Sequence, residues 1–270
     1  MNNNFAIFIL SHNRADNIKT YDTLRKCGYT GKIYVLIDNE DLQTEIYKSR
    51  FGDDLIVFDK KKQSVNSDSC DNFGNLSTPL YARNYCFEIA KKLNLSHFIM
   101  ADDDIYDLKH VFVNSDDKFI KNHIKNLDSI IESLIRFINT SKYISSCSFV
   151  FDSEYFGGKN GKFKEGLGRT IQQFILFKSD TDVRFLSSKN EDLNISIANF
   201  DKLFFENFSL SVCSPIRGTN EGGILYTSTY ENNMYTLMIA PSCFKILGNG
   251  KMRKNNDRIY PKIISWRFKK

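Results

Sequence analysis

Three consecutive aspartates, Asp102, Asp103 and Asp104, follow the apolar run His97–Met100. Alternate residues of an extended segment point to the same side, so Asp102 and Asp104 are predicted to form a pair of neighbouring carboxylates. Like charges this close raise each other's pKa, and a divalent cation keeps both groups ionised. Carboxylate oxygens select Mg²⁺ or Mn²⁺, which often complete their coordination with phosphate oxygens. An isolated pair of this spacing is more often an acidic loop or a helix N-cap, but its position after a buried strand favours a metal site.

Polar and basic side chains follow the first apolar run and begin a later helix. The segment Ser11–Arg14 comes directly after Phe5–Leu10. We predict that it holds the base and phosphates of a nucleotide at the mouth of the same crevice. Arg83 and Asn84 begin the helix before the aspartates, where a guanidinium group would bind pairs of diphosphate oxygens. A surface arginine in a salt bridge is the ordinary alternative for each arginine.

The acidic pair Glu191 and Asp192 is a third candidate, because it begins a predicted helix. The apolar positions of that helix are Leu193, Ile195 and Ile197. Acidic residues in a first turn stabilise the helix dipole, which is the ordinary explanation. The functional alternative is a general base that removes the proton of an acceptor hydroxyl as this hydroxyl attacks a sugar carbon. A base opposite a metal-bound leaving group implies single displacement.

Apolar runs that end in polar residues predict the strands that carry these groups. These strands are expected at Phe5–Leu10, Ile33–Ile37 and Leu55–Phe58, with Asp38 and Asp59 following the second and third. The carboxyl ends of parallel strands meet at one edge of an open sheet, where ligands bind. Helical periodicity predicts helices over Pro79–Leu93 and from about Asp116 to Asn139. Further strands are predicted at Ile144–Phe151, Gln172–Phe177 and Ser209–Cys213.

Length and composition indicate one α/β domain. With 270 residues, 41% of them hydrophobic and 14% aromatic, the chain is able to build one substantial core. The longest apolar run near its start, Phe5–Leu10, is too short to cross a membrane. Its six cysteines lack any C-x-x-C spacing, so neither a zinc knuckle nor a disulfide framework is indicated. We therefore expect a cytoplasmic protein with no membrane partner, located in the host cytoplasm if a bacteriophage encodes it.

Four segments of the sequence carry a family resemblance. They are I-F-I-L-S-H-N-R, P-L-Y-A-R-N-Y-C, F-I-M-A-D-D-D-I and R-I-Y-P-K-I-I-S-W. Together they resemble GT-A-fold glycosyltransferases, and more narrowly the TET/JBP-associated group, which includes the base J glucosyltransferase and many bacteriophage proteins. The resemblance implies a Rossmann-like, mostly parallel central sheet flanked by helices, in a single domain over residues 1–270. Residues 1–115 would form the nucleotide-sugar-binding half and residues 116–270 the acceptor-binding half.

The resemblance also implies a role for each candidate residue. Asp102 and Asp104 would serve the metal, Mn²⁺ or Mg²⁺, and the donor diphosphate, with Asp103 near the ribose or the sugar. The other residues that would line the nucleotide site are Ser11, Asn13, Arg14, Asp38 and Arg83. The donor would be a nucleotide-sugar such as a UDP-sugar. Asp192, with Glu191 beside it, would be the base.

The histidines depart from the family pattern. Many GT-A enzymes have a histidine near the C-terminus as a further metal ligand. The four histidines of this chain are His12, His97, His110 and His123, and Tyr260 stands about where that ligand is expected. The expected coordination is therefore the aspartate pair, phosphate oxygens and water, and the alternative is a weaker dependence on metal than is usual in the family.

The acceptor implied by the resemblance is the hydroxyl of a modified pyrimidine in DNA, 5-hydroxymethylcytosine or 5-hydroxymethyluracil. Duplex DNA would have to be distorted, or the base flipped, to bring that hydroxyl to the cleft. The segments Lys159–Lys164 and Lys251–Lys270 are basic and would contact phosphates. Tyr155, Phe156 and Trp266 are candidates for stacking on an extruded base, although core packing is the commoner use of an aromatic residue.

Two other functions remain open at this point. One keeps the fold and the donor but uses a saccharide or protein hydroxyl as acceptor. The other is a non-catalytic DNA-binding protein, which would need a basic surface but no aspartate cluster. Replacing Asp102 and Asp104 by Asn distinguishes an enzyme, which would lose sugar transfer, from a binder, which would keep its hold on DNA.

Overall fold

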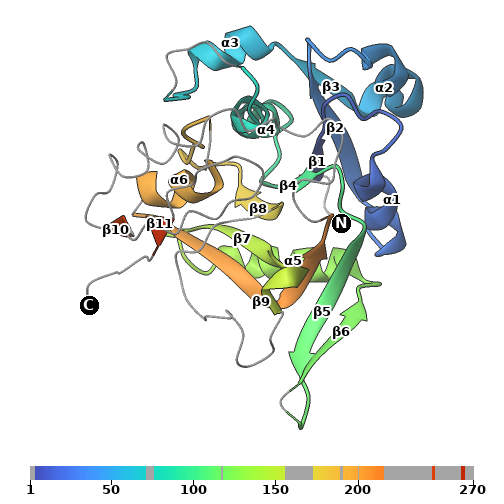
Figure 1. Cartoon of the computed structure of the whole chain (residues 1–270), viewed down its shortest axis with the longest axis vertical. Coiled ribbons are helices and arrows are strands. Elements are labelled where there is room, and N and C mark those ends of the chain that lie inside the picture. The colour runs from blue at the N-terminus through green and yellow to red at the C-terminus, as the bar shows by residue number, and fades with distance from the viewer. Residues whose placement is uncertain are drawn as a thin grey trace.

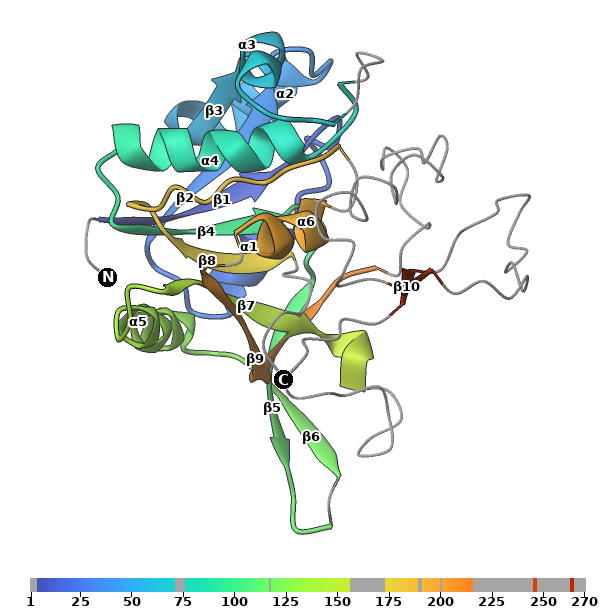
Figure 2. The same cartoon turned by 90° about the vertical axis from the view of Figure 1, so that its left-hand side faces the viewer.

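A nine-stranded sheet with helices against both faces forms the centre of the protein (Figure 1; Figure 2). The computed structural model describes residues 4–70, 76–116, 118–155, 173–188, 191–199 and 201–215, with 245–246 and 263–264. The strands of the sheet are β1 (Phe5–Leu10), β2 (Lys32–Asp38), β3 (Leu55–Phe58), β4 (His97–Asp102), β5 (Asp107–Val113), β6 (Phe119–His123), β7 (Ile144–Phe151), β8 (Phe174–Lys178) and β9 (Leu203–Cys213). A separate pair is formed by β10 (Lys245–Ile246) and β11 (Ile263–Ile264). The predicted α/β class, flanked by helices as in the GT-A fold, is confirmed.

The strand order is β3-β2-β1-β4-β8-β7-β9-β5-β6. The first four strands are parallel, as is the pair β7 and β9, and the other neighbours are antiparallel. The predicted parallel sheet therefore describes the N-terminal half, and the rest of the sheet is mixed. In the parallel part Leu10 lies beside both Leu36 and Asp102, so the ends of β1, β2 and β4 share one edge.

Different helices cover the two faces of the sheet. They are α1 (Lys19–Lys26), α2 (Thr44–Phe51), α3 (Lys60–Val65), α4 (Leu80–Lys92), α5 (Leu127–Ile138) and α6 (Glu191–Ala198), with short 3₁₀ turns at Gly52–Asp54 and Asp152–Tyr155. Residues of α1, α2 and α5 pack in the hydrophobic cluster on one face, and residues of α4 and α6 pack in the cluster on the other. The site described below draws on helices from both faces, with α1 and α2 on one side and α4 and α6 on the other.

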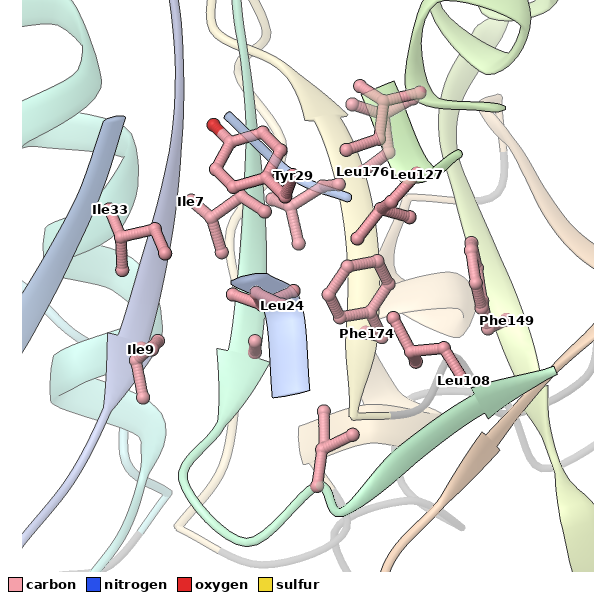
Figure 3. Packing of buried hydrophobic residues seen from close by; sticks show 14 of the residues in the cluster. Ile7, Ile9, Leu24, Tyr29, Ile33, Leu108, Leu127, Phe149, Phe174 and Leu176 are labelled. Atoms are coloured by element: carbon pink, nitrogen blue, oxygen red, sulfur yellow. The ribbon is translucent and has the colours of Figure 1, made fainter. Parts of the chain in front are cut away.

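The strand β1 shows why the two clusters form. Successive side chains of a strand point to opposite faces, and both faces of this strand are covered. Ile7 and Ile9 belong to one cluster, whereas Ala6 and Phe8 belong to the other. Figure 3 shows Ile7 and Ile9 packed with residues from several other elements, among them Leu24, Tyr29, Leu127 and Phe174. A continuous apolar strand is therefore the expected sequence for the middle of this sheet.

The helix predicted from Asp116 to Asn139 is wrong in its first part. Residues Phe119–His123 form β6, which pairs antiparallel with β5, and α5 begins only at Leu127. The backbone amide of Ile124 also bonds to the carbonyl of Leu108, 2.9 Å away, which continues the ladder. The apolar residues before Leu127 have helical spacing, which is why a helix was predicted there. Pairing with β5 determines the structure of this segment instead. From Leu127 onward the predicted face is correct, since Leu127, Ile131, Leu134 and Ile138 are buried.

The sheet runs through both predicted halves of the chain. Residue 115 lies in the turn between β5 and β6, and β5 also pairs with β9. Among the helices of the described residues, none is long and apolar enough to span a membrane.

Candidate active site

The three aspartates lie where the parallel strands end. Asp102 is the last residue of β4 and Asp103 and Asp104 form the turn that follows. Asp102 is held in the sheet from the other side as well, because its amide donates to the carbonyl of Gln173, 3.1 Å away. The predicted position of the cluster, directly after a buried strand, is confirmed.

Thr20, near the start of α1, fixes the backbone of this turn. Its hydroxyl donates to the carbonyl of Asp102 at 2.6 Å and accepts from the amide of Ile105 at 2.9 Å. Its own amide donates to the carbonyl of Asp103 at 3.2 Å. Thr20 is fully buried, so these bonds are shielded from water. Three hydrogen bonds from one residue therefore set the path of the chain through the aspartates.

Asp103 points away from solvent and is fully engaged by the residues after β1. Only 4% of it is exposed. Ser11 Oγ donates to its Oδ2 at 2.6 Å, and Arg14 Nη1 donates to its Oδ1 at 2.9 Å. Burial raises the pKa of Asp103, while Ser11 and Arg14 oppose the rise. The structure thus joins three of the predicted donor-site residues to one another.

Asp102 faces a buried arginine from α4. Arg83 Nη2 lies 3.9 Å from Asp102 Oδ1, and Arg83 Nη1 lies 3.5 Å from Glu191 Oε1 at the start of α6. The guanidinium group also lies 5.2 Å from the ring centre of Phe185. Burial lowers the pKa of Arg83, but Glu191, Asp102 and Asp192 outweigh this and raise it. Arg83 therefore stays charged and joins β4 to α6.

The positive charge near Asp102 does not compensate for its burial and for the neighbouring acids, so its pKa is raised. Burial raises the pKa of Asp102 to about 7, and although Arg83 opposes the rise, Asp104 and Glu191 add to it. A cation beside this group would favour the ionised form. The oxygen donors present suit Mg²⁺ or Mn²⁺. Over the described residues, no group of three or more His, Cys, Asp or Glu side chains is placed to hold a metal ion.

Asn84, next to Arg83, holds the segment that leads to α6. Its Oδ1 accepts from the amide of Phe185 at 2.9 Å, and its Nδ2 donates to the carbonyl of Phe185 at 3.0 Å. Nδ2 also donates to Ser67 Oγ at 3.1 Å. The two adjacent residues of α4 thus have different tasks, since Asn84 positions a loop and Arg83 faces the acids.

Asp38 and Asn13 belong to a second network at the ends of β1 and β2. Asp38 Oδ2 lies 3.0 Å from His12 Nδ1 and 3.1 Å from Lys60 Nζ, and its Oδ1 accepts from the amide of Glu40 at 3.0 Å. Burial raises the pKa of Asp38, but His12 and Lys60 outweigh it, so the pKa is lowered.

The side chain of Asn13 belongs to this second network too. Asn13 Nδ2 lies 2.9 Å from His12 Nε2, and Oδ1 accepts from the amide of Leu42 at 3.1 Å. Asn13 itself has a positive φ of 53°, a conformation that Asn tolerates better than most residues. The residues predicted to touch a nucleotide thus also hold the turn that would present it.

Glu191 and Asp192 begin α6, as the sequence predicted. Glu191 is buried and directed to Arg83, whereas Asp192 is half-buried. Tyr155, considered for base stacking, is 4% exposed and donates its hydroxyl to the carbonyl of Phe208 at 2.7 Å, so it packs in the core. The predicted contacts of Phe156, Lys159–Lys164, Lys251–Lys270, Tyr260 and Trp266 lie outside the described residues.

Tyr47 and Lys60 are among the residues of the site that sequence reasoning missed. Tyr47 on α2 contacts Ser11 and Arg14, and Lys60 on α3 contacts Asp38. Neither belongs to a motif, and Tyr47 lies 36 residues from its partner Ser11. The one available signal was the position of Lys60 directly after Asp59 at the end of a predicted strand.

Solved structures with a distant resemblance to this chain include glucosyl-3-phosphoglycerate synthase from Mycobacterium tuberculosis. One, in complex with Mg²⁺ and uridine-diphosphate, has 11% identity and a TM-score of 0.45, with 79% of this chain and 72% of that chain covered. Another, in complex with Mn²⁺, UDP-glucose and phosphoglyceric acid, has 12% identity and a TM-score of 0.45, with 80% and 73% covered. This likeness is too distant to bear on donor, metal or acceptor. No curated protein matches the sequence.

The family comparison is more specific. Residues 5–203 match the family described as TET-Associated Glycosyltransferase. This range extends from β1 to the start of β9 and includes every candidate residue of the site. Because the match covers well over half of the chain, the protein belongs to the TET-associated glycosyltransferase family and is an enzyme that uses nucleotide-sugars as donors.

Proposed function

We propose that the enzyme transfers a sugar from a UDP-sugar to the hydroxyl of 5-hydroxymethylcytosine or 5-hydroxymethyluracil in DNA. The reaction is assisted by Mn²⁺ or Mg²⁺ and is a single displacement. The observation that carries the donor part is the environment of Asp102, a carboxylate with a pKa of about 7 beside three further acids and a buried arginine. Such a site gains most from a ligand that brings a divalent cation with it.

Asp102 and Asp104 are the metal ligands in this proposal. Their oxygens fit the donor preference of both ions, and they stand at the sheet edge where ligands of open α/β sheets bind. Donor phosphates and water would supply the remaining ligands, because two aspartates provide only part of the coordination of such an ion. When bound, the ion supplies positive charge that stabilises the departing diphosphate.

The protein's own cations flank the same edge. Arg83 offers a buried guanidinium beside Asp102 and Glu191, and its positive charge supports a role in binding a diphosphate. The rest of the proposed donor site comes from the ends of β1 and β2, and consists of Ser11, Asn13, Arg14 and Asp38. Asp103 is hydrogen-bonded to Ser11 and Arg14. In this proposal, these residues bind the donor and also hold one another in position.

Asp192 is the proposed general base, with Glu191 beside it. Glu191 is held by Arg83 at 3.5 Å, which favours a structural and electrostatic task for this residue. Asp192 is more exposed and is the better placed of the two to meet an incoming hydroxyl. It takes the proton of the acceptor hydroxyl as the oxygen bonds to the sugar carbon and the bond to the diphosphate breaks.

The DNA acceptor rests on family membership. Three of the segments that resemble the TET/JBP-associated group fall on β1, α4 and β4 and the residues that follow the two strands, and the resemblance implies a hydroxymethylated pyrimidine as acceptor. A flipped base would deliver its hydroxyl to Asp192 at the start of α6.

Mass spectrometry of hydroxymethylated DNA, incubated with the enzyme, Mn²⁺ and a panel of nucleotide-sugars, tests this function. We expect a hexose or pentose added to the modified base, and no addition with the Asp102→Asn/Asp104→Asn variant or with excess EDTA. DNA with unmodified cytosine is the matched control. Turnover of a UDP-sugar without any change in DNA mass would reject the DNA acceptor and point to a saccharide or protein hydroxyl. DNA binding without use of any nucleotide-sugar would reject the donor site.

A further inference from the structure

Tyr47, on α2, places a buried hydroxyl at the centre of the turn after β1. Its oxygen lies 2.8 Å from Ser11 Oγ and 3.0 Å from the backbone nitrogen of Arg14. The side chain is fully buried and its ring lies 6.4 Å from that of Phe51. Tyr47 therefore touches two residues of the donor site without reaching solvent.

The direction of these hydrogen bonds follows from counting protons. Ser11 has one hydroxyl proton, which it donates to Asp103. The proton between Ser11 and Tyr47 must then come from Tyr47, and Tyr47 in turn accepts from the amide of Arg14. Burial raises the pKa of Tyr47 to about 12, so the phenol keeps the proton that it donates.

These bonds close a ring around Asp103. The ring runs from Tyr47 to Ser11, from Ser11 to one oxygen of Asp103, and from the other oxygen to Arg14, whose amide returns to Tyr47. Thr20 fixes the backbone of the aspartate turn, whereas Ser11 and Arg14 hold the two oxygens of the Asp103 side chain. The position of α2 is thus transmitted to the residue between Asp102 and Asp104.

We propose that Tyr47 is a positioning residue of the donor site. Through Ser11 it orients Asp103, and so it sets how the turn presents Asp102 and Asp104. This inference rests on the proposed donor site for its effect on nucleotide binding, but its effect on the turn does not depend on the donor.

The test compares Tyr47→Phe with Tyr29→Phe. Tyr29 is a buried tyrosine of the same hydrophobic cluster, and its hydroxyl donates to the carbonyl of Lys32 at 2.9 Å, away from the aspartates. Each variant removes one buried hydroxyl and keeps the ring. We expect Tyr47→Phe to raise the Kd for UDP about tenfold in the presence of Mn²⁺. This is the factor that corresponds to the loss of one or two hydrogen bonds. Tyr29→Phe should leave this Kd unchanged at a similar melting temperature.

Hydrogen exchange gives a readout that is independent of nucleotide. The peptide that spans the aspartate turn should exchange faster in Tyr47→Phe than in the wild type and in Tyr29→Phe. Unchanged exchange in that peptide would overturn the role of Tyr47, whatever the result with UDP. Failure of the wild type to bind UDP with Mn²⁺ would overturn the proposed donor instead, and the exchange comparison would still decide the positioning role.

A double variant tests whether Tyr47 acts through Ser11. If it does, Tyr47→Phe should weaken UDP binding about tenfold in the wild type and less than twofold in the Ser11→Ala background. An equal loss of UDP affinity in the two backgrounds would show that Tyr47 does not act through Ser11. It would reject the proposed path from Tyr47 through Ser11 to Asp103.

Discussion

At the scale of single residues, Asp102 carries a charge in a place that does not favour it. Its pKa is about 7 in the folded chain, because of burial and of neighbouring acids, against 3.8 for an ordinary aspartate. The folded state therefore binds a proton more tightly than the unfolded state between these values. The stability that this protonation provides is fully present below pH 3.8 and is lost as the pH rises through 7.

Replacing Asp102 by Asn should stabilise the metal-free protein at pH 8. We expect a gain of about 1–2 kcal/mol, less than the full pKa shift implies, because about a third of the side chain meets solvent. At pH 5 the gain should be smaller, because folded Asp102 is protonated there while the unfolded residue is already ionised, and it should vanish only below pH 3.8. Urea denaturation in EDTA at both pH values measures this, with the exposed Asp16→Asn as control. A loss of stability at pH 8 would contradict the electrostatic argument.

Asp192→Asn should separate chemistry from binding. Removal of a general base lowers kcat by roughly 10²–10⁴-fold while the Kd of the donor stays the same, because the base acts only in the transition state. Single-turnover assays and UDP titration check the two quantities separately. Equal losses in kcat and in donor affinity would assign Asp192 a structural role.

The sequence was sufficient to predict where the site lies, but not which side chains contact one another within it. An apolar run before Asp102 and polar residues after Leu10 sufficed to place these groups at one sheet edge. The contacts of Tyr47 and Lys60 were not predictable, because they join helices α2 and α3 to strands distant in sequence. Only the packed structure determines which helical residue meets which strand end.

At the scale of elements, the end of α1 shows how closely neighbouring elements approach. Gly28 follows this helix with a φ of 84°, and a Cβ atom there would lie 2.4 Å from the carbonyl oxygen of Lys125. The amide of Leu127 also bonds to the carbonyl of Cys27 at 2.9 Å, so the end of α1 and the start of α5 are in direct contact. A side chain at position 28 would push these backbones apart.

Gly28→Ala should therefore cost more stability than Gly52→Ala. Both glycines have positive φ, which disfavours alanine, but a Cβ at Gly52 meets nothing within 4 Å. We expect a loss of about 1–3 kcal/mol for Gly52→Ala, whose φ of 51° and ψ of −123° lie outside the left-handed helical region. Overlap with the Lys125 carbonyl should add about 1–3 kcal/mol to the backbone cost of Gly28→Ala. Chemical denaturation of the two variants measures the difference. Similar losses would show that α5 moves to accommodate the new side chain.

At the scale of the whole molecule, one sheet joins the proposed donor and acceptor halves. β4 of the first half pairs with β8, and β5 pairs with β9, so the boundary at residue 115 cuts a continuous hydrogen-bonded layer. The hydrophobic clusters likewise contain residues from both halves. The two proposed halves therefore have their hydrophobic core in common.

Fragments 1–115 and 116–270 should not fold separately. Each would expose strand edges and apolar surface that the other covers. Circular dichroism of the separate fragments should show little cooperative melting, whereas the intact chain should unfold in one transition. A fragment 1–115 that melts cooperatively and binds UDP would establish an independent donor domain.

The guanidinium of Arg83, set between the carboxylates of β4 and α6, provides an internal counter-charge. Because this charge is part of the polypeptide, the carboxylates of β4 and α6 have a cationic partner before any ligand binds. In the proposed reaction, the divalent ion would then be free to arrive with each incoming donor and to depart with the spent nucleotide.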